Sequence, residues 1–165
     1  MRISKGWGSH LPVLIKLLAQ TDGPVLELGA GLYSTPFLHW ACFGAKRKLV
    51  SYDTSKEWFG YTVKYREDFH EVHFVEEGGW DAVDIEKPWD VVLVDQHPDI
   101  RRHIDIARLA NHAKYIVVHD TDVSSEAGYN YDSVRPLFKY QIRMQMLSPE
   151  TSIFSNFVDV TTFTL

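Results

Sequence analysis

The chain has 165 residues, of which 45% are hydrophobic and 24% are charged. This length and composition fit one globular domain over residues 1–165 and exclude a disordered chain. The formal net charge is −5, and a mildly acidic domain is a poor ligand for polyanions because phosphate neutralisation needs clustered Lys and Arg. The one basic run, 46–48, is interpreted as a solvated helix end. We therefore expect no nucleic-acid partner.

Cysteine usage and hydropathy indicate where the protein resides. Cys42 is the only cysteine in the sequence, which excludes a disulfide framework. Lys16 interrupts the first apolar stretch, so the pattern is not that of a signal peptide. No apolar run approaches the roughly 18 residues that a membrane-spanning helix needs. These features predict a cytoplasmic protein that does not bind membranes.

Short apolar runs alternate with longer amphipathic segments along the first 120 residues. The predicted strands cover 25–28, 49–52, 72–75, 90–95 and 115–118. The predicted helices cover 11–18, with Ser9 as the cap, then 34–45, 55–67 and 100–111. Strands that alternate with crossover helices predict a parallel sheet covered on both faces, a three-layer α/β fold.

The C-terminal part of the sequence breaks this alternation. After a short helix near 132–138, two runs at 142–147 and 153–163 are rich in β-forming residues. Pro149 lies in their connection, which is too short for a crossover helix, so the two runs should pair antiparallel. We therefore expect a mostly parallel, Rossmann-like sheet that ends in an antiparallel hairpin.

A glycine loop after the first predicted strand is the clearest candidate binding site. Gly29 and Gly31 allow a ligand to approach the backbone closely, and the helix that follows presents unpaired N–H groups. Asp53 ends the second predicted strand, where a carboxylate can accept hydrogen bonds from ribose hydroxyls. This combination predicts a nucleotide-type ligand.

Glu27-Leu28-Gly29-Ala30-Gly31 resembles motif I of the class I S-adenosylmethionine-dependent methyltransferases, which runs acid-x-Gly-x-Gly. A dinucleotide-binding fold would prefer glycine at position 34. The resemblance implies the methyltransferase sheet layout, S-adenosylmethionine as cofactor, Glu27 in the network around the methionine amino group, and Asp53 on the ribose. It also leaves Trp80 either stacked on adenine or covering the sheet edge. The cofactor-binding residues expected from it are Glu27, Gly29, Gly31, Ser34, Asp53, Thr54, Trp80 and Asp95.

Polar residues follow the fourth and fifth predicted strands, where ligands of open parallel sheets bind. The expected catalytic residues there are Asp95, His97, His119 and Asp120. Asp95 matches the family's position beside the reactive methyl group, and either histidine can act as a base near neutral pH. These side chains are therefore expected to face the methyl acceptor.

The same two segments resemble those of catechol-type and related bacterial methyltransferases, whose acids at these strand ends hold a divalent cation. That resemblance implies Mg²⁺ bound by Asp95 and Asp120. The sequence departs from both patterns, because Gln96 stands where glycine is usual and His119 replaces an acid. Two carboxylates would also leave most of the six Mg²⁺ positions to water.

Together these patterns predict methyl transfer from S-adenosylmethionine to an oxygen or nitrogen of a small molecule. No inserted cap domain is evident, so the acceptor site would come from the loops around 6–10 and 124–131, or from the partner subunit of a homo-oligomer. Two alternatives stay open: a cofactor-binding module without turnover, and an aminopropyltransferase on the same fold. The acidic strand-four motif of the latter is not evident at 95–98.

Overall fold

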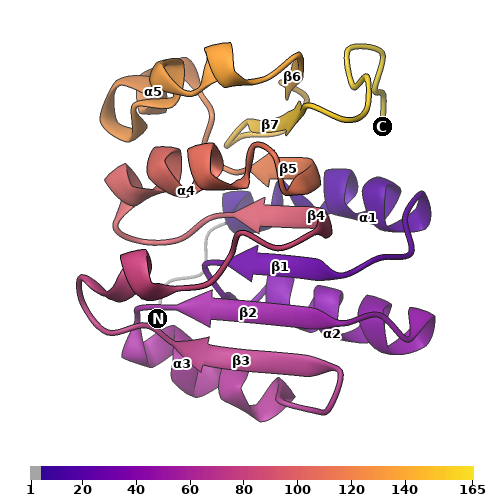
Figure 1. Ribbon diagram of the computed structural model, residues 1–165, viewed down its shortest axis with the longest axis vertical. Coiled ribbons are helices and arrows are strands. Elements are labelled where there is room, and N and C mark those ends of the chain that lie inside the picture. The colour runs from indigo at the N-terminus through magenta and orange to yellow at the C-terminus, as the bar shows by residue number, and fades with distance from the viewer. Residues whose placement is uncertain (1–4) are drawn as a thin grey trace.

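The computed structural model describes residues 5–165 and contains a seven-stranded sheet with helices on both faces (Figure 1). The strands are β1 (Val25–Leu28), β2 (Leu49–Asp53), β3 (His70–Phe74), β4 (Trp89–Val94), β5 (Ala113–Val118), β6 (Tyr140–Met144) and β7 (Thr151–Ser155). The α-helices are α1 (Leu11–Ala19), α2 (Ser34–Ala45), α3 (Lys56–Thr62), α4 (Arg102–Leu109) and α5 (Val123–Tyr129).

The strand order is β3-β2-β1-β4-β5-β7-β6. β1 pairs in parallel with β2 and β4, and the parallel ladder continues to β3 on one side and β5 on the other. β7 runs antiparallel to both β5 and β6. The predicted five parallel strands and terminal hairpin are thus confirmed. The strand order reverses between β1 and β4, because the chain returns from β3 at the sheet edge to place β4 beside β1, and open sheets bind ligands at such a point.

Alternation along the strands separates two apolar cores. Leu26 and Leu28 of β1 face the core that α4 covers, whereas Val25 faces the core formed with α1 and α2. Glu27 shares the Val25 face because side chains alternate with a period of two. A carboxylate is therefore placed inside the α2 core, directly below the glycine loop.

Several helix and strand boundaries differ from the prediction. The largest strand difference is at β7, which covers Thr151–Ser155 where 153–163 was expected, and β6 covers Tyr140–Met144 where 142–147 was expected. The helix expected over 55–67 is α-helical only to Thr62 and continues as a 3₁₀ turn over Val63–Tyr65. The third strand begins at His70 rather than at residue 72. The short helix expected near 132–138 consists of two 3₁₀ turns, Tyr131–Ser133 and Arg135–Leu137.

Helix α5 was not predicted from the sequence. Its sequence, VSSEAGY, contains two serines and a glycine, which are poor helix formers, and it has no apolar stripe to reveal it. The helix begins after Asp122 and ends at Asn130, which adopts the left-handed conformation. Within residues 5–165, no helix combines the length and apolar character needed to cross a bilayer. The single-domain prediction over 1–165 stays a prediction, and its first four residues lie outside the described range.

Candidate functional site

A cavity of about 620 Å³ opens beyond the carboxyl ends of β1, β2, β4 and β5. Its walls come from the glycine loop, from the ends of the strands and from the segment that precedes α1. The lining residues are Trp7, His10, Gly29–Ser34, Asp53–Ser55, Trp58, Asp95, His97, His119, Asp120 and Pro149. The cavity thus joins most of the predicted cofactor residues to all four predicted catalytic positions.

Gly29 and Gly31 serve different purposes in the loop. Gly29 has φ +93°, and a Cβ there would lie 2.4 Å from the carbonyl carbon of Asp95. Only glycine fits, because the loop turns back against the end of β4 in a conformation that side chains disfavour. At Gly31 the nearest atom to an added Cβ is Ser34 Oγ at 3.7 Å, so a side chain there would meet the ligand rather than the protein.

Glu27 supports the loop from below and does not line the cavity. It is fully buried, and its carboxylate accepts hydrogen bonds from Thr35 Oγ1 at 3.0 Å and from Ser51 Oγ at 2.6 Å. Thr35 Oγ1 in turn accepts the Gly31 N–H at 2.9 Å. Burial raises the pKa of Glu27 to about 7, against the effect of the surrounding hydroxyls. Its geometry favours positioning of the Gly31 loop over direct ligand contact.

Asp53 lies at the end of β2 and lines the cavity with only 6% of its surface exposed. Oδ1 accepts the Ser55 N–H at 2.5 Å, which fixes the carboxylate at the start of α3. Burial raises the pKa of Asp53 to about 6, an effect reduced by hydrogen bonds from the backbone of Ser55 and Ala30. The carboxylate is ionised at neutral pH and can accept hydroxyl hydrogens from the cavity.

Trp80 lies in the core and does not line the cavity. Its indole is 3% exposed and belongs to the core on the α4 side, and Nε1 donates to the carbonyl of His97 at 3.2 Å. A ring buried in this way offers no free face for stacking on adenine. Thr54 Oγ1 donates to the same carbonyl at 3.0 Å, so Trp80 and Thr54 together hold the loop that follows β4.

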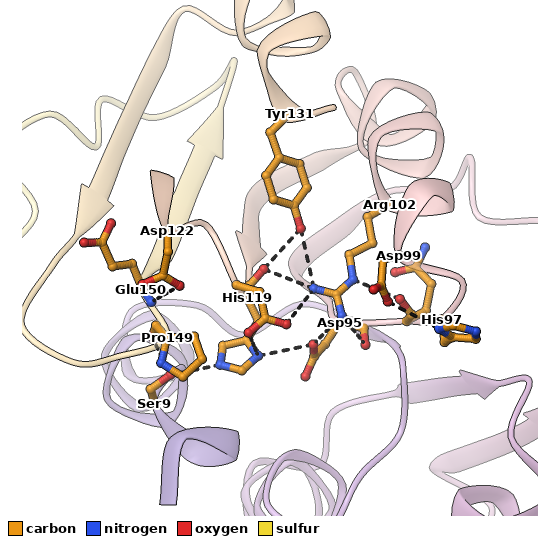
Figure 2. Close-up of polar contacts among 12 residues, drawn as sticks. Ser9, Asp95, His97, Asp99, Arg102, His119, Asp122, Tyr131, Pro149 and Glu150 are labelled. Carbon is orange, nitrogen blue, oxygen red and sulfur yellow. Dashed lines mark hydrogen bonds and ion pairs between the residues drawn. The ribbon is translucent and has the colours of Figure 1, made fainter. Parts of the chain in front are cut away.

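Asp95 and His119 meet at the ends of β4 and β5 (Figure 2), and Asp120 contacts the same histidine. His119 Nδ1 lies 3.2 Å from Asp95 Oδ1 and 3.4 Å from Asp120 Oδ1. Burial opposes the charged form of His119, but its hydrogen bond to Asp95 and the two negative charges raise its pKa. Asp120 has φ +56°, a conformation that Asp tolerates better than most residues. The structure thus brings three of the four predicted side chains together, and their catalytic role stays a prediction.

His97 lies apart from that cluster. Its side chain is 80% exposed and its Nδ1 lies 3.3 Å from Asp99 Oδ1, and Figure 2 shows the ring turned toward Asp99 at the edge of the group. The predicted catalytic role of His97 therefore receives no support from its position, and it stays a prediction.

Arg102 occupies the place that the sequence analysis gave to Mg²⁺. Its guanidinium bonds Asp95 Oδ1 at 2.9 Å and Asp120 Oδ2 at 3.1 Å, and Figure 2 shows it reaching both strand ends from α4. Tyr131 bonds the backbone carbonyl of His119 beside it. Since a fixed cation already bridges the two carboxylates, the structure does not support Mg²⁺ at Asp95 and Asp120.

Several residues that shape this site were not predicted from the sequence. Ser9 does not cap α1: its hydroxyl donates to the carbonyl of Pro149 at 2.7 Å and lies 2.9 Å from His119 Nε2. His10 lines the cavity although it is 1% exposed. Trp7 and Trp58 form a T-shaped pair at 5.8 Å in its wall. Of these residues, only those in 6–10 lay in a loop that the sequence had suggested for the acceptor site.

Comparison with known proteins gives the fold a reference. No protein-family model matches the sequence, and no curated protein matches it. The human METTL16 N-terminal domain in complex with SAH superimposes with a TM-score of 0.66 at 13% identity, over 96% of this chain and 73% of that chain. Cofactor-bound Rv0187 from MTB gives 0.66 at 16% identity, over 96% and 83% of the two chains. An rRNA methylase from Streptococcus thermophilus gives 0.60 at 13% identity, over 96% and 100%.

The chain has the class I methyltransferase fold. These likenesses also correct two expectations, the small-molecule acceptor and the absence of a nucleic-acid partner, because one similar structure is an rRNA methylase. Net charge alone does not exclude a nucleic-acid partner. A charge of −5 is an average over the whole chain, whereas a single unpaired base can be held by stacking on aromatic side chains, which net charge does not report.

Proposed function

We propose that the protein transfers a methyl group from S-adenosylmethionine to a base of an RNA strand. One observation carries the proposal: a single cavity joins the glycine loop and Asp53 to the cluster of Asp95 and His119. The first pair fits a ribose-containing cofactor, and the second fits an acceptor atom that loses a proton. A group-transfer reaction needs the donor and the acceptor held at a fixed distance, and one cavity that contains both groups of residues can do this.

The cofactor half of the site rests on geometry that only glycine and an ionised carboxylate supply. Gly29 brings the loop against β4, Gly31 leaves the approach to the cavity open, and Asp53 can accept hydrogen bonds from two ribose hydroxyls. S-adenosylmethionine, when bound, would supply an electrophilic methyl group. The chain's own contribution is then to position the cofactor and to exclude water from one side of it.

The acceptor half of the site combines aromatic walls with a proton acceptor. Trp7, Trp58 and Tyr33 line the cavity, and Trp7 is 36% exposed, so flat rings are available for an unstacked base. Asp95 and His119 lie behind them and can hold the exocyclic nitrogen or hydroxyl in place. Burial favours the protonated form of Asp95, but its hydrogen bond to His119 and the charges of His119 and Arg102 keep its pKa below the usual value.

A labelling experiment tests both halves. The protein is incubated with S-adenosylmethionine carrying a tritiated methyl group, together with ribosomal RNA, single-stranded DNA of matched length, or no acceptor. We expect tritium in RNA, sensitive to ribonuclease, and much less of it with the Asp53→Asn variant when S-adenosylmethionine is below saturation. Calorimetry with S-adenosylhomocysteine separates the steps: binding without labelling of any RNA would refute the acceptor class, and binding of NAD instead would refute the methyltransferase function.

A further inference from the structure

His10, Asp95 and His119 form a buried cluster beside the cavity, where the start of α1 meets the ends of β4 and β5. One candidate ligand atom from each of the three lies within 4.8 Å of the other two. The His10 ring meets the His119 ring edge-on, with centroids 4.8 Å apart. Two imidazoles and a carboxylate are therefore held together by elements far apart in the sequence.

Hydrogen-bond accounting defines the protonation of His119. Ser9 Oγ donates its one hydrogen to the Pro149 carbonyl at 2.7 Å, so in its 2.9 Å contact with His119 Nε2 it must accept. Nε2 therefore carries hydrogen, and Nδ1 faces Asp95 Oδ1 at 3.2 Å. A bare lone pair would repel a carboxylate oxygen at that distance. Nδ1 must meet a positive charge there, either its own proton or a metal ion.

His10 favours the metal ion. It is 1% exposed, and neither of its ring nitrogens has a hydrogen-bond partner among residues 5–165. Buried imidazoles without partners are rare and call for a ligand or ion. A neutral imidazole has one free lone pair, which can bind a metal ion. A metal ion would satisfy His10, whereas a proton on His119 would not.

The local charge also leaves room for a cation. Asp95 and Asp120 contribute two negative charges, and Arg102 neutralises one of them. The separation of 3.2 Å between His119 Nδ1 and Asp95 Oδ1 is close to the roughly 3.4 Å expected between two ligands on a tetrahedral zinc ion with bonds of about 2.1 Å. Imidazole ligands select zinc-like ions and not magnesium.

We propose that His10, Asp95 and His119 bind a Zn²⁺ ion or a divalent ion of the same ligand preference. Ser9 is then the outer partner that holds His119 with Nδ1 toward the metal, as Figure 2 shows for the Ser9–His119–Asp95 chain. Three protein ligands leave a coordination position open for water or for an acceptor atom from the cavity. The site does not depend on the proposed methyl transfer, because no cofactor atom takes part in it.

Cobalt(II) absorption tests the site without an activity assay. The chelator-treated protein is titrated with Co²⁺, and Zn²⁺ is then added in competition. We expect one equivalent of Co²⁺ with visible absorption that Zn²⁺ abolishes. His10→Phe keeps a ring in place but cannot bind metal, so it should lose the signal. His73→Ala removes a histidine from β3, outside the cluster, and should keep it. Ser9→Ala should weaken the affinity about 10- to 100-fold.

Three results would overturn the proposal: no stoichiometric Co²⁺ binding by the wild-type protein, unchanged binding by His10→Phe, or loss of binding by His73→Ala as well. Circular dichroism verifies folding of each variant. Should His10→Phe unfold, His119→Asn replaces it and must also lose the signal. Calorimetry with S-adenosylhomocysteine on the same samples separates the two proposals, since metal binding can fail while cofactor binding persists, and the reverse.

Discussion

Lowering the pH from 7.5 to 5 should weaken the binding of S-adenosylhomocysteine about tenfold through Asp53. The carboxylate must be ionised to accept two ribose hydroxyl hydrogens, and burial raises its pKa from 3.8 to about 6. At pH 7.5 nearly all of it is ionised, whereas at pH 5 about one tenth is. The apparent Kd rises by the inverse of the competent fraction, hence by about tenfold.

The Asp53→Asn variant provides the matched control for this titration. An amide keeps the shape and can still accept a hydrogen bond, but it carries no charge. Binding at pH 7.5 should therefore weaken by about 1–3 kcal/mol, the range for charge-assisted hydrogen bonds. The affinity of this variant should no longer depend on the ionisation of residue 53. Any pH dependence that remains comes from another group, such as Glu27, whose pKa is raised to about 7.

Isothermal titration calorimetry at pH 7.5, 6 and 5 measures the affinity of the wild-type and Asp53→Asn proteins for S-adenosylhomocysteine under the same conditions. The reasoning would be refuted by a wild-type affinity that stays flat over this range, or by equal slopes for wild-type and Asp53→Asn protein. Either result would mean that the buried carboxylate does not contact the ligand, and that the ribose lies elsewhere in the cavity.

Three further perturbations test the loop, the ion pairs and the proposed catalytic cluster. Gly31→Val should abolish cofactor binding in calorimetry with an unchanged melting temperature, whereas Gly29→Ala should lower that temperature, because only Gly29 is closed in by the protein. Equal effects would contradict the division of roles. Arg102→Met should lower the free energy of unfolding by about 3–5 kcal/mol, since it removes the buried guanidinium that bridges two partly buried carboxylates; a loss below 1 kcal/mol in urea denaturation would contradict this. His119→Ala should reduce turnover about 10²–10⁴-fold with cofactor affinity retained, because it removes the partner that orients Asp95 and keeps it ionised, and His97→Ala should not; the opposite ranking in tritium transfer would support the predicted catalytic role of His97.

Local patterns in the sequence determined the fold and half of the site. Apolar runs such as 90–95 indicate buried strands because alternation and burial are local properties, and the short connection at Pro149 required an antiparallel pair. The loop at Gly29 and the acid at Asp53 were predictable for the same reason: each follows a strand directly, and parallel strands bring their carboxyl ends to one edge. A helix without an apolar stripe, α5, left no such pattern.

Tertiary structure alone decided what surrounds the strand ends. Ser9 contacts His119 across 110 positions of sequence, and no local signal distinguishes that hydroxyl from a helix cap. Arg102 lies on the first turn of α4, where it reads as a solvated helical residue, yet the turn of the chain after β4 directs it between two carboxylates. His10 precedes α1, and nothing in the local sequence predicts that its ring meets His119 after β5. Side-chain type and spacing predict which groups reach the sheet edge. Which charged partners those groups meet there depends on how segments far apart in the sequence pack together.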